Sequence, residues 1–190
     1  MKVIFLDIDG VLNNEPHAIA LHKLVEEGKM SEKEYYDIWD LPYDDTALPL
    51  KHIVEETGAK IVLSSSWRVL PTEVKKLSKK LKEYNLELMD KTSYGVTKEE
   101  LKEAGFDYRK AWDLNLFEEV DTAKGTHDRG AEIAVWLHRH PEVESFVILD
   151  DDIEDIKPYY SKEHIQTDFY GNGLTMELAD KAIEILNEKD

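Results

Sequence analysis

The chain has 190 residues, which is enough for one α/β domain with a well-filled core and a small insertion, but short for two full domains. Apolar residues make up 42% of the sequence and charged residues 34%, a balance that argues against a disordered or a membrane protein. Acidic residues number 41 against 24 Lys and Arg, and the net charge of −17 disfavours binding of an extended nucleic acid.

Neither a membrane span nor a signal peptide is predicted. No apolar run approaches the roughly 20 residues needed to cross a bilayer. The apolar start Met1–Leu6 is interrupted by Asp7 and Asp9, and no small-residue cleavage site follows. The absence of cysteine excludes a disulfide framework, a thiolate zinc site and a cysteine nucleophile. We therefore expect a cytoplasmic protein without a membrane partner. The sequence does not reveal its oligomeric state.

The first predicted strand is Val3–Leu6, a continuous apolar run of the kind seen in parallel strands buried on both faces. It ends in Asp7-Ile8-Asp9-Gly10, which places two carboxylates where the strand gives way to a turn that Gly10 permits. Crowded carboxylates repel one another, so a metal site is one interpretation. A turn in which the acids make local hydrogen bonds is the other, and this motif alone favours neither.

A helical insertion is predicted at about residues 16–45, where acids surround an aromatic cluster of Tyr35, Tyr36, Trp39 and Tyr43. A helix over Ala47–Glu56 and a strand over Ile61–Leu63 follow. The strand ends in Ser64-Ser65-Ser66-Trp67-Arg68, which supplies hydroxyls and backbone N–H groups, although simple turn chemistry also accounts for serines at this position.

The next predicted helix, Pro71–Tyr84, carries the one concentrated basic patch of the sequence. Its lysines alternate with apolar residues at helical spacing, and they are Lys75, Lys76, Lys79, Lys80 and Lys82. We expect the solvated face of an amphipathic helix, with a phosphate-attracting rim as the alternative. An irregular stretch at about residues 93–128 is the second insertion, and either insertion could form a lid over the site.

The last segments are a helix over Arg129–Arg139, a strand over Phe146–Leu149 and a helix from Thr175 through Leu186. The strand ends in Asp150-Asp151-Asp152. An acidic run is typical of a solvated loop, but an acid at a buried strand end is costly unless a hard cation relieves it. The alternation of strands and helices predicts an α/β fold with a doubly wound parallel sheet, in which the polar strand ends meet at one edge.

Taken in order from Val3 to about Asp155, these segments resemble the haloacid dehalogenase (HAD) superfamily. In that family the first core strand ends in Asp-x-Asp-Gly, which Asp7, Asp9 and Gly10 match. The next core strand ends in a Ser or Thr, for which Ser65 is the best match and Ser64 the neighbouring choice.

The other two motifs of the family lie later in the chain. A Lys or Arg opens the helix before the last core strand; Arg129 fits best, and Lys124 is a rival that preserves the commoner Lys. An acidic pair ends that strand, matched by Asp150 and Asp151.

A narrower likeness is to the small HAD domains grouped with Swiss-army-knife RNA-repair proteins. It rests on Ser65-Ser66-Trp67-Arg68, on the helix from Arg129 with Trp136-Leu137, and on Gly173-Leu174-Thr175. The long stretch between Thr92 and Arg129 departs from that group, so the substrate does not carry over.

The resemblance implies a single HAD-like, Rossmann-like domain over residues 1–190 that acts as a magnesium-dependent phosphomonoesterase. Asp7 would be the nucleophile that forms an aspartyl-phosphate, and Asp9 would act as acid and then as base. Mg²⁺ would be held by the Asp7 carboxylate, the Asp9 carbonyl and Asp151. Asp150 would assist or order a ligating water.

Substrate contacts are expected from several polar side chains. Ser65 and Arg129 would stabilise the phosphoryl group as catalytic residues. The further substrate-binding candidates are Ser64, Ser66, Arg68 and Lys124. The expected substrate is a small phosphorylated metabolite or nucleotide, with a polynucleotide end as the alternative. A receiver-type phosphoacceptor domain is disfavoured, because in receivers the acidic pair comes first and the Lys last.

Overall fold

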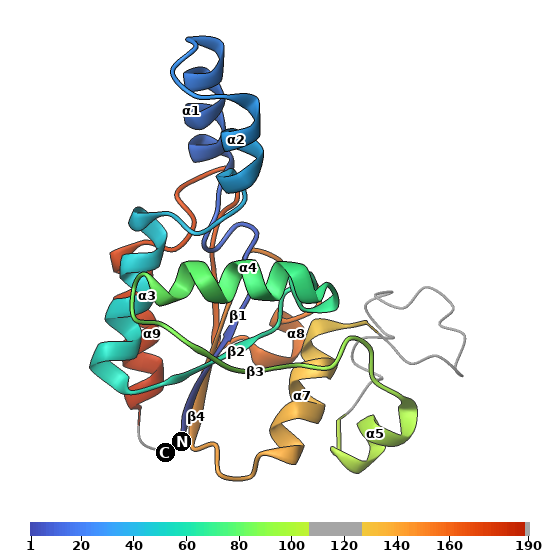
Figure 1. Ribbon diagram of the computed structural model, residues 1–190. Helices are drawn as coiled ribbons and strands as arrows, with labels where there is room; N and C mark the ends of the chain where they lie inside the picture. The colour runs from blue at the N-terminus through green and yellow to red at the C-terminus, as the bar shows by residue number, and fades with distance from the viewer. Residues whose placement is uncertain (107–126, 189–190) are drawn as a thin grey trace.

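The computed structural model describes residues 1–106 and 127–188, which form a five-stranded parallel sheet with helices on both faces (Figure 1). The strand order is β3-β2-β1-β4-β5. The strands are β1 (Lys2–Leu6), β2 (Lys60–Leu63), β3 (Leu88–Lys91), β4 (Ser145–Asp150) and β5 (His164–Gln166). The main helices are α3 (Asp44–Thr57), α4 (Pro71–Lys82), α7 (Arg129–Arg139) and α9 (Met176–Asn187). The α/β fold with a doubly wound parallel sheet is therefore confirmed.

The central strand β1 is buried on both faces, which explains its continuous apolar sequence. Ile4 and Leu6 lie in one core cluster, together with residues of α3, α4 and α9. Val3 and Phe5 lie in the other, and Phe5 packs edge-on against Trp136 of α7 with ring centroids 5.2 Å apart. Burial of these apolar side chains, at roughly 1.5–3 kcal/mol each, stabilises the layers before any polar group is considered.

The sheet register brings the polar strand ends to one edge. Hydrogen bonding continues one residue past β1 and β2, because Asp7 N donates to Leu149 O and Ser64 N donates to Leu6 O, each at 2.9 Å. Asp150 ends β4, beside β1. Asp7, Ser64 and Asp150 are therefore neighbours at the carboxyl edge of the sheet.

Two strands were not predicted from the sequence. β3 is largely exposed and carries polar residues, and β5 is three residues long with a single buried residue, Ile165. Both are edge strands of the described sheet, where one side of each has no neighbouring strand, so neither needs a continuous apolar run. None of the described helices is long and apolar enough to cross a membrane.

The first insertion forms a helical hairpin of α1 (Glu15–Glu26) and α2 (Glu32–Ile38), which projects beyond the carboxyl edge of the sheet (Figure 1). Neither helix has a buried residue. Local caps hold them instead, with the Asn14 side chain at the start of α1 and a Ser31–Glu34 capping box at the start of α2. A lid function for this hairpin stays a prediction.

The second insertion begins with α5 (Lys98–Glu103), whose buried Leu101 lies in a small cluster with Ala131 and Val135 of α7. Residues 107–126 lie outside the described part of the chain. The prediction of a lid at about 93–128 falls largely on them.

A buried ion pair joins the loop after β2 to α7. Arg68 and Glu132 pair with side chains that are 3% and 0% exposed. The Arg68 guanidinium also donates to the carbonyls of Ser64, Ser65 and Ser93. Glu132 accepts a 2.7 Å hydrogen bond from Gly95 N. The pair therefore fixes two strand-end loops against the helix that begins at Arg129.

We predict that Glu132→Ala destabilises the protein by about 3–5 kcal/mol, because the Arg68 charge would remain buried without its carboxylate. Urea unfolding followed by circular dichroism measures this change. The matched control is Glu177→Ala, which breaks an exposed pair with Lys181 on α9 and should have little effect. Equal losses from the two substitutions would contradict the structural role given to Arg68 and Glu132.

Candidate active site

Asp7 lies buried directly after β1, and the Arg129 guanidinium contacts both Asp7 and Asp150. Arg129 Nη1 donates to Asp7 Oδ1 at 3.0 Å and to Asp150 Oδ2 at 2.7 Å. Because Arg129 is the first residue of α7, its position depends on how the start of this helix packs. A Cβ on the next residue, Gly130, would lie 2.6 Å from the Asp155 carbonyl oxygen, so glycine allows that close approach.

A third carboxylate completes a cluster of acids. Asp7, Asp150 and Asp151 offer oxygen atoms that all lie within 4.8 Å of one another. Gly10 brings the chain after Asp9 against this cluster, since its φ is +74° and a Cβ there would lie 2.4 Å from the Asp151 carboxyl. The glycine of the first motif is therefore required by both backbone conformation and space.

The electrostatics of the cluster favour a bound cation. Burial raises the pKa of Asp7, while the neighbouring Arg129 lowers it. Burial also raises the pKa of Asp150 well above its ordinary value, with Arg129 opposing the shift and Asp7 adding to it. Arg129 contacts only two of the three carboxylates, Asp7 and Asp150, so the cluster keeps excess negative charge. A donor set made of oxygen atoms alone suits a hard divalent ion. The residues present therefore fit Mg²⁺.

The serines after β2 occupy three different environments. Ser65 is buried, and its side chain lies close enough to Asp7 to lower the pKa of that carboxyl group. Ser64 is also buried, but its hydroxyl has no hydrogen-bond partner among the described residues. Ser66 is exposed at the start of a 3₁₀ turn, Ser66–Val69. Of the three, Ser65 is the one that the fold brings to Asp7, as the second motif predicts.

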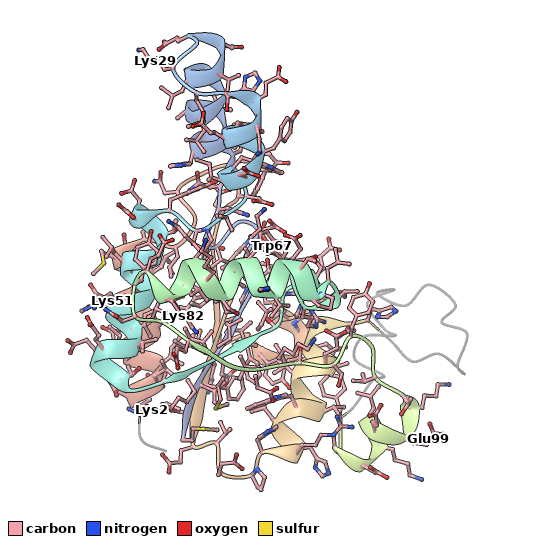
Figure 2. All side chains as sticks on the ribbon, in the orientation of Figure 1. Lys2, Lys29, Lys51, Trp67, Lys82 and Glu99 are labelled. Carbon is pink, nitrogen blue, oxygen red and sulfur yellow. The ribbon has the colours of Figure 1, made fainter. Side chains whose placement is uncertain are left out.

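Asp9 differs from the other acids because it is exposed. Its Oδ1 accepts a 2.8 Å hydrogen bond from Asn13 Nδ2, and its Oδ2 accepts a 3.1 Å hydrogen bond from Trp67 Nε1. Trp67 lies toward the end of the sheet from which the α1–α2 hairpin projects (Figure 2). Neither Trp67 nor Asn13 was predicted from the sequence to act at the site. Trp67 directly follows Ser64-Ser65-Ser66 in the sequence, and this position is the signal that could have indicated a place near the site.

Two of the predicted substrate contacts are not found at the site among the described residues. Arg68 is nearly inaccessible and occupied by Glu132 and backbone carbonyls, so the expectation that it binds substrate is corrected to a structural role. The position of Arg68 after the serine motif could not reveal a buried partner 64 residues away in the sequence. Lys124 lies outside the described residues. Arg129, its rival for the third motif, contacts both Asp7 and Asp150.

A hollow of about 560 Å³ opens beside Asp151. It is lined by Gln166 at the end of β5 and by the loop that follows, which includes Asn172 and the exposed Tyr170. The charged residues among its described lining, Asp151 and Asp168, are both acidic. This side of the site can therefore receive a polar or aromatic group more readily than a second phosphate.

Comparison with known proteins agrees with this geometry. Residues 3–179 match the family described as the HAD domain in Swiss Army Knife RNA repair proteins. No curated protein and no solved structure gives a match. The family match supports a phosphatase-type or RNA-repair role in general, and HAD proteins generally use Mg²⁺. Because the match extends from β1 into α9, the chain belongs to the family of HAD domains found in Swiss Army Knife RNA repair proteins.

Proposed function

We propose that this protein is a Mg²⁺-dependent phosphomonoesterase that transfers the phosphoryl group of its substrate to Asp7. The observation that carries the proposal is the buried Asp7 carboxylate, which accepts a hydrogen bond from Arg129, lies near Ser65 and clusters with Asp150 and Asp151. Such a set supplies a nucleophile, donors for phosphoryl oxygens and a cation site in one place.

Two carboxylates perform the covalent and proton-transfer chemistry. In the first step an Asp7 carboxylate oxygen attacks phosphorus, the bond to the leaving oxygen breaks, and Asp9 gives that oxygen its proton. In the second step a water oxygen attacks phosphorus, Asp9 takes the water proton, and the bond to Asp7 breaks. Asp7 returns as a carboxylate and Asp9 as an acid, so the cycle closes.

Arg129 and Ser65 act on the charge of the reacting group. The guanidinium, already between Asp7 and Asp150, can share its donors with phosphoryl oxygens as charge builds there. The Ser65 hydroxyl can donate in the same way once the phosphoryl group is bonded to Asp7. Both donors are held in advance by the fold, which keeps the cost of reorganisation low.

The metal would be held by the Asp7 carboxylate, the Asp9 backbone carbonyl and Asp151, with Asp150 assisting or ordering a ligating water. When bound, Mg²⁺ offsets the repulsion between the anionic nucleophile and the anionic phosphate. The raised pKa values of Asp7, Asp150 and Asp151 are consistent with a site whose carboxylates need this positive charge.

For the substrate we favour a small phosphorylated metabolite or a mononucleotide. The lysines of α4 offer a limited grip on a polynucleotide, because Lys76 pairs with Asp40 and Lys80 pairs with Glu83. The hollow beside Asp151 is lined by further acidic residues, and the chain carries a net charge of −17. Both repel the phosphate backbone of a polynucleotide. Hydrolysis of a polynucleotide end is the second candidate, and the family's association with RNA repair favours it.

We predict that Asp7→Asn abolishes phosphate release without unfolding the protein, because the amide is close in shape to the carboxylate but is not a competent nucleophile. Phosphate release from a panel of phosphomonoesters measures activity, and circular dichroism checks the fold.

The matched control for Asp7→Asn is Asp37→Asn on the exposed face of α2, which should keep full activity. Chelation of divalent ions should stop the wild-type enzyme, and added Mg²⁺ should restore it. Persistent turnover by the Asp7→Asn protein would refute Asp7 as the nucleophile. A single phosphorylation event without turnover in the wild type would instead indicate a phosphoacceptor domain.

The substrate preference can be tested by salt. We predict that a mononucleotide is hydrolysed at least as efficiently as an oligonucleotide end, with kcat/KM changing less than about twofold between low and moderate salt. The same comparison is made with a variant in which glutamine replaces three exposed lysines of α4, namely Lys75, Lys79 and Lys82. An oligonucleotide preference that is lost both in salt and in this variant would establish end repair instead.

A further inference from the structure

We propose that Trp67 and Asn13 are positioning residues that hold the Asp9 carboxyl group, one on each oxygen, in the orientation needed for proton transfer. The inference rests on the proposed function, in which Asp9 is the acid and base. Neither the four sequence motifs nor the family match assigns these two side chains a role in catalysis.

Asp9 needs outside support more than Asp7 does. Asp7 is buried, so packing and Arg129 fix its side chain. Asp9 is exposed, and an exposed Asp side chain is free to change rotamer. An acid that protonates a leaving oxygen must lie within hydrogen-bonding distance of it, and a misplacement of about 1 Å can cost on the order of a hundredfold in rate. Something must therefore hold the Asp9 carboxyl group in place.

Trp67 supplies a rigid support on one side. Its ring is partly buried against the main core cluster, and its backbone N lies 3.4 Å from Ser65 Oγ in the 3₁₀ turn. The indole N–H points to Asp9 Oδ2 at 3.1 Å. An indole N–H is a hydrogen-bond donor only and does not exchange its proton with substrate. Trp67 can therefore orient Asp9 without entering the reaction.

Asn13 supplies the other support and connects it to the insertion. Its side chain is buried, and its amide nitrogen donates to Asp9 Oδ1 at 2.8 Å and to the Asp40 carbonyl at 2.9 Å. Its amide oxygen accepts from Gly10 N at 3.1 Å. Because both hydrogens of the Asn13 amide are donated and its oxygen accepts, the Asn13 side chain is held in one orientation. Asp40 lies just after α2, so Asp9 is linked to the base of the hairpin.

The two donors leave Asp9 able to react. Each carboxyl oxygen can accept about two hydrogen bonds, and each here accepts one from these side chains. One acceptor position on each oxygen remains for the proton of the leaving group or of water. The arrangement thus fixes the plane of the carboxyl group and keeps its chemistry available.

A purely structural role for Trp67 predicts a different result from a positioning role. Proton donation by Asp9 matters for an alkyl phosphate, whose alkoxide is a poor leaving group. It matters little for 2,4-dinitrophenyl phosphate, whose phenolate leaves without a proton. Loss of Asp9 positioning therefore slows the first substrate selectively, whereas a general disturbance of the site slows both.

The experiment measures kcat/KM for both substrates with the Trp67→Phe enzyme and with an enzyme in which benzothienylalanine, an indole isostere without the N–H, replaces Trp67. We expect a fall of about tenfold or more on the alkyl phosphate and less than about twofold on the dinitrophenyl ester. The matched control is Trp136→Phe, which removes a 2.8 Å indole hydrogen bond to Asp90 at a distance from Asp9 and should not discriminate between substrates.

A double-substitution cycle completes the test. In the Asp9→Asn background, Trp67→Phe should cause no further loss on the alkyl phosphate, because the group that it positions is already gone. Equal losses on both substrates, or full additivity with Asp9→Asn, would overturn the proposal while leaving the phosphatase function intact. A wild-type protein without Asp7-dependent turnover of either ester would overturn the proposed function, and this inference with it.

Discussion

Three carboxylates crowd together within 4.8 Å at the carboxyl edge of the sheet, and burial makes their mutual repulsion costly. Arg129 offsets part of this charge through Asp7 and Asp150, and a hard divalent ion can offset the remainder. The arrangement exists because β1 and β4 are parallel neighbours, which carry their terminal acids to the same edge. The packing that holds α7 against the sheet therefore also holds the Arg129 guanidinium beside Asp7.

The loop after β2 connects the separate parts of the site. Within four residues it places Ser65 on Asp7, Trp67 on Asp9 and Arg68 on Glu132. Glu132 lies about one turn beyond Arg129 on α7, so the buried ion pair and the cation that contacts Asp7 share a helix. One short segment thus fixes the positions of the Ser65 hydroxyl, the Asp9 carboxyl group and α7 relative to one another.

The sequence indicated those features that depend on local pattern. Val3–Leu6, Ile61–Leu63 and Phe146–Leu149 were recognisable as strands because burial on both faces demands continuous apolar runs. The acids and serines that follow these runs fell at the sheet edge as expected. The edge strands β3 and β5 were missed because one open side relaxes that demand. Arg68 was misread because its partner Glu132 is distant in sequence, and a buried ion pair has no local signature. The hydrogen bonds of Asn13 and Trp67 to Asp9 likewise depend on tertiary contacts.

The central claim is that Asp7 receives the phosphoryl group, and the covalent intermediate is its most direct test. Enzyme turning over a phosphomonoester with Mg²⁺ can be quenched rapidly in acid and digested for peptide mass spectrometry. The account predicts a phosphoryl group on Asp7 during turnover, which disappears when substrate is exhausted. Steady phosphate release with no phosphoryl group on Asp7, or with one on another residue, would contradict it.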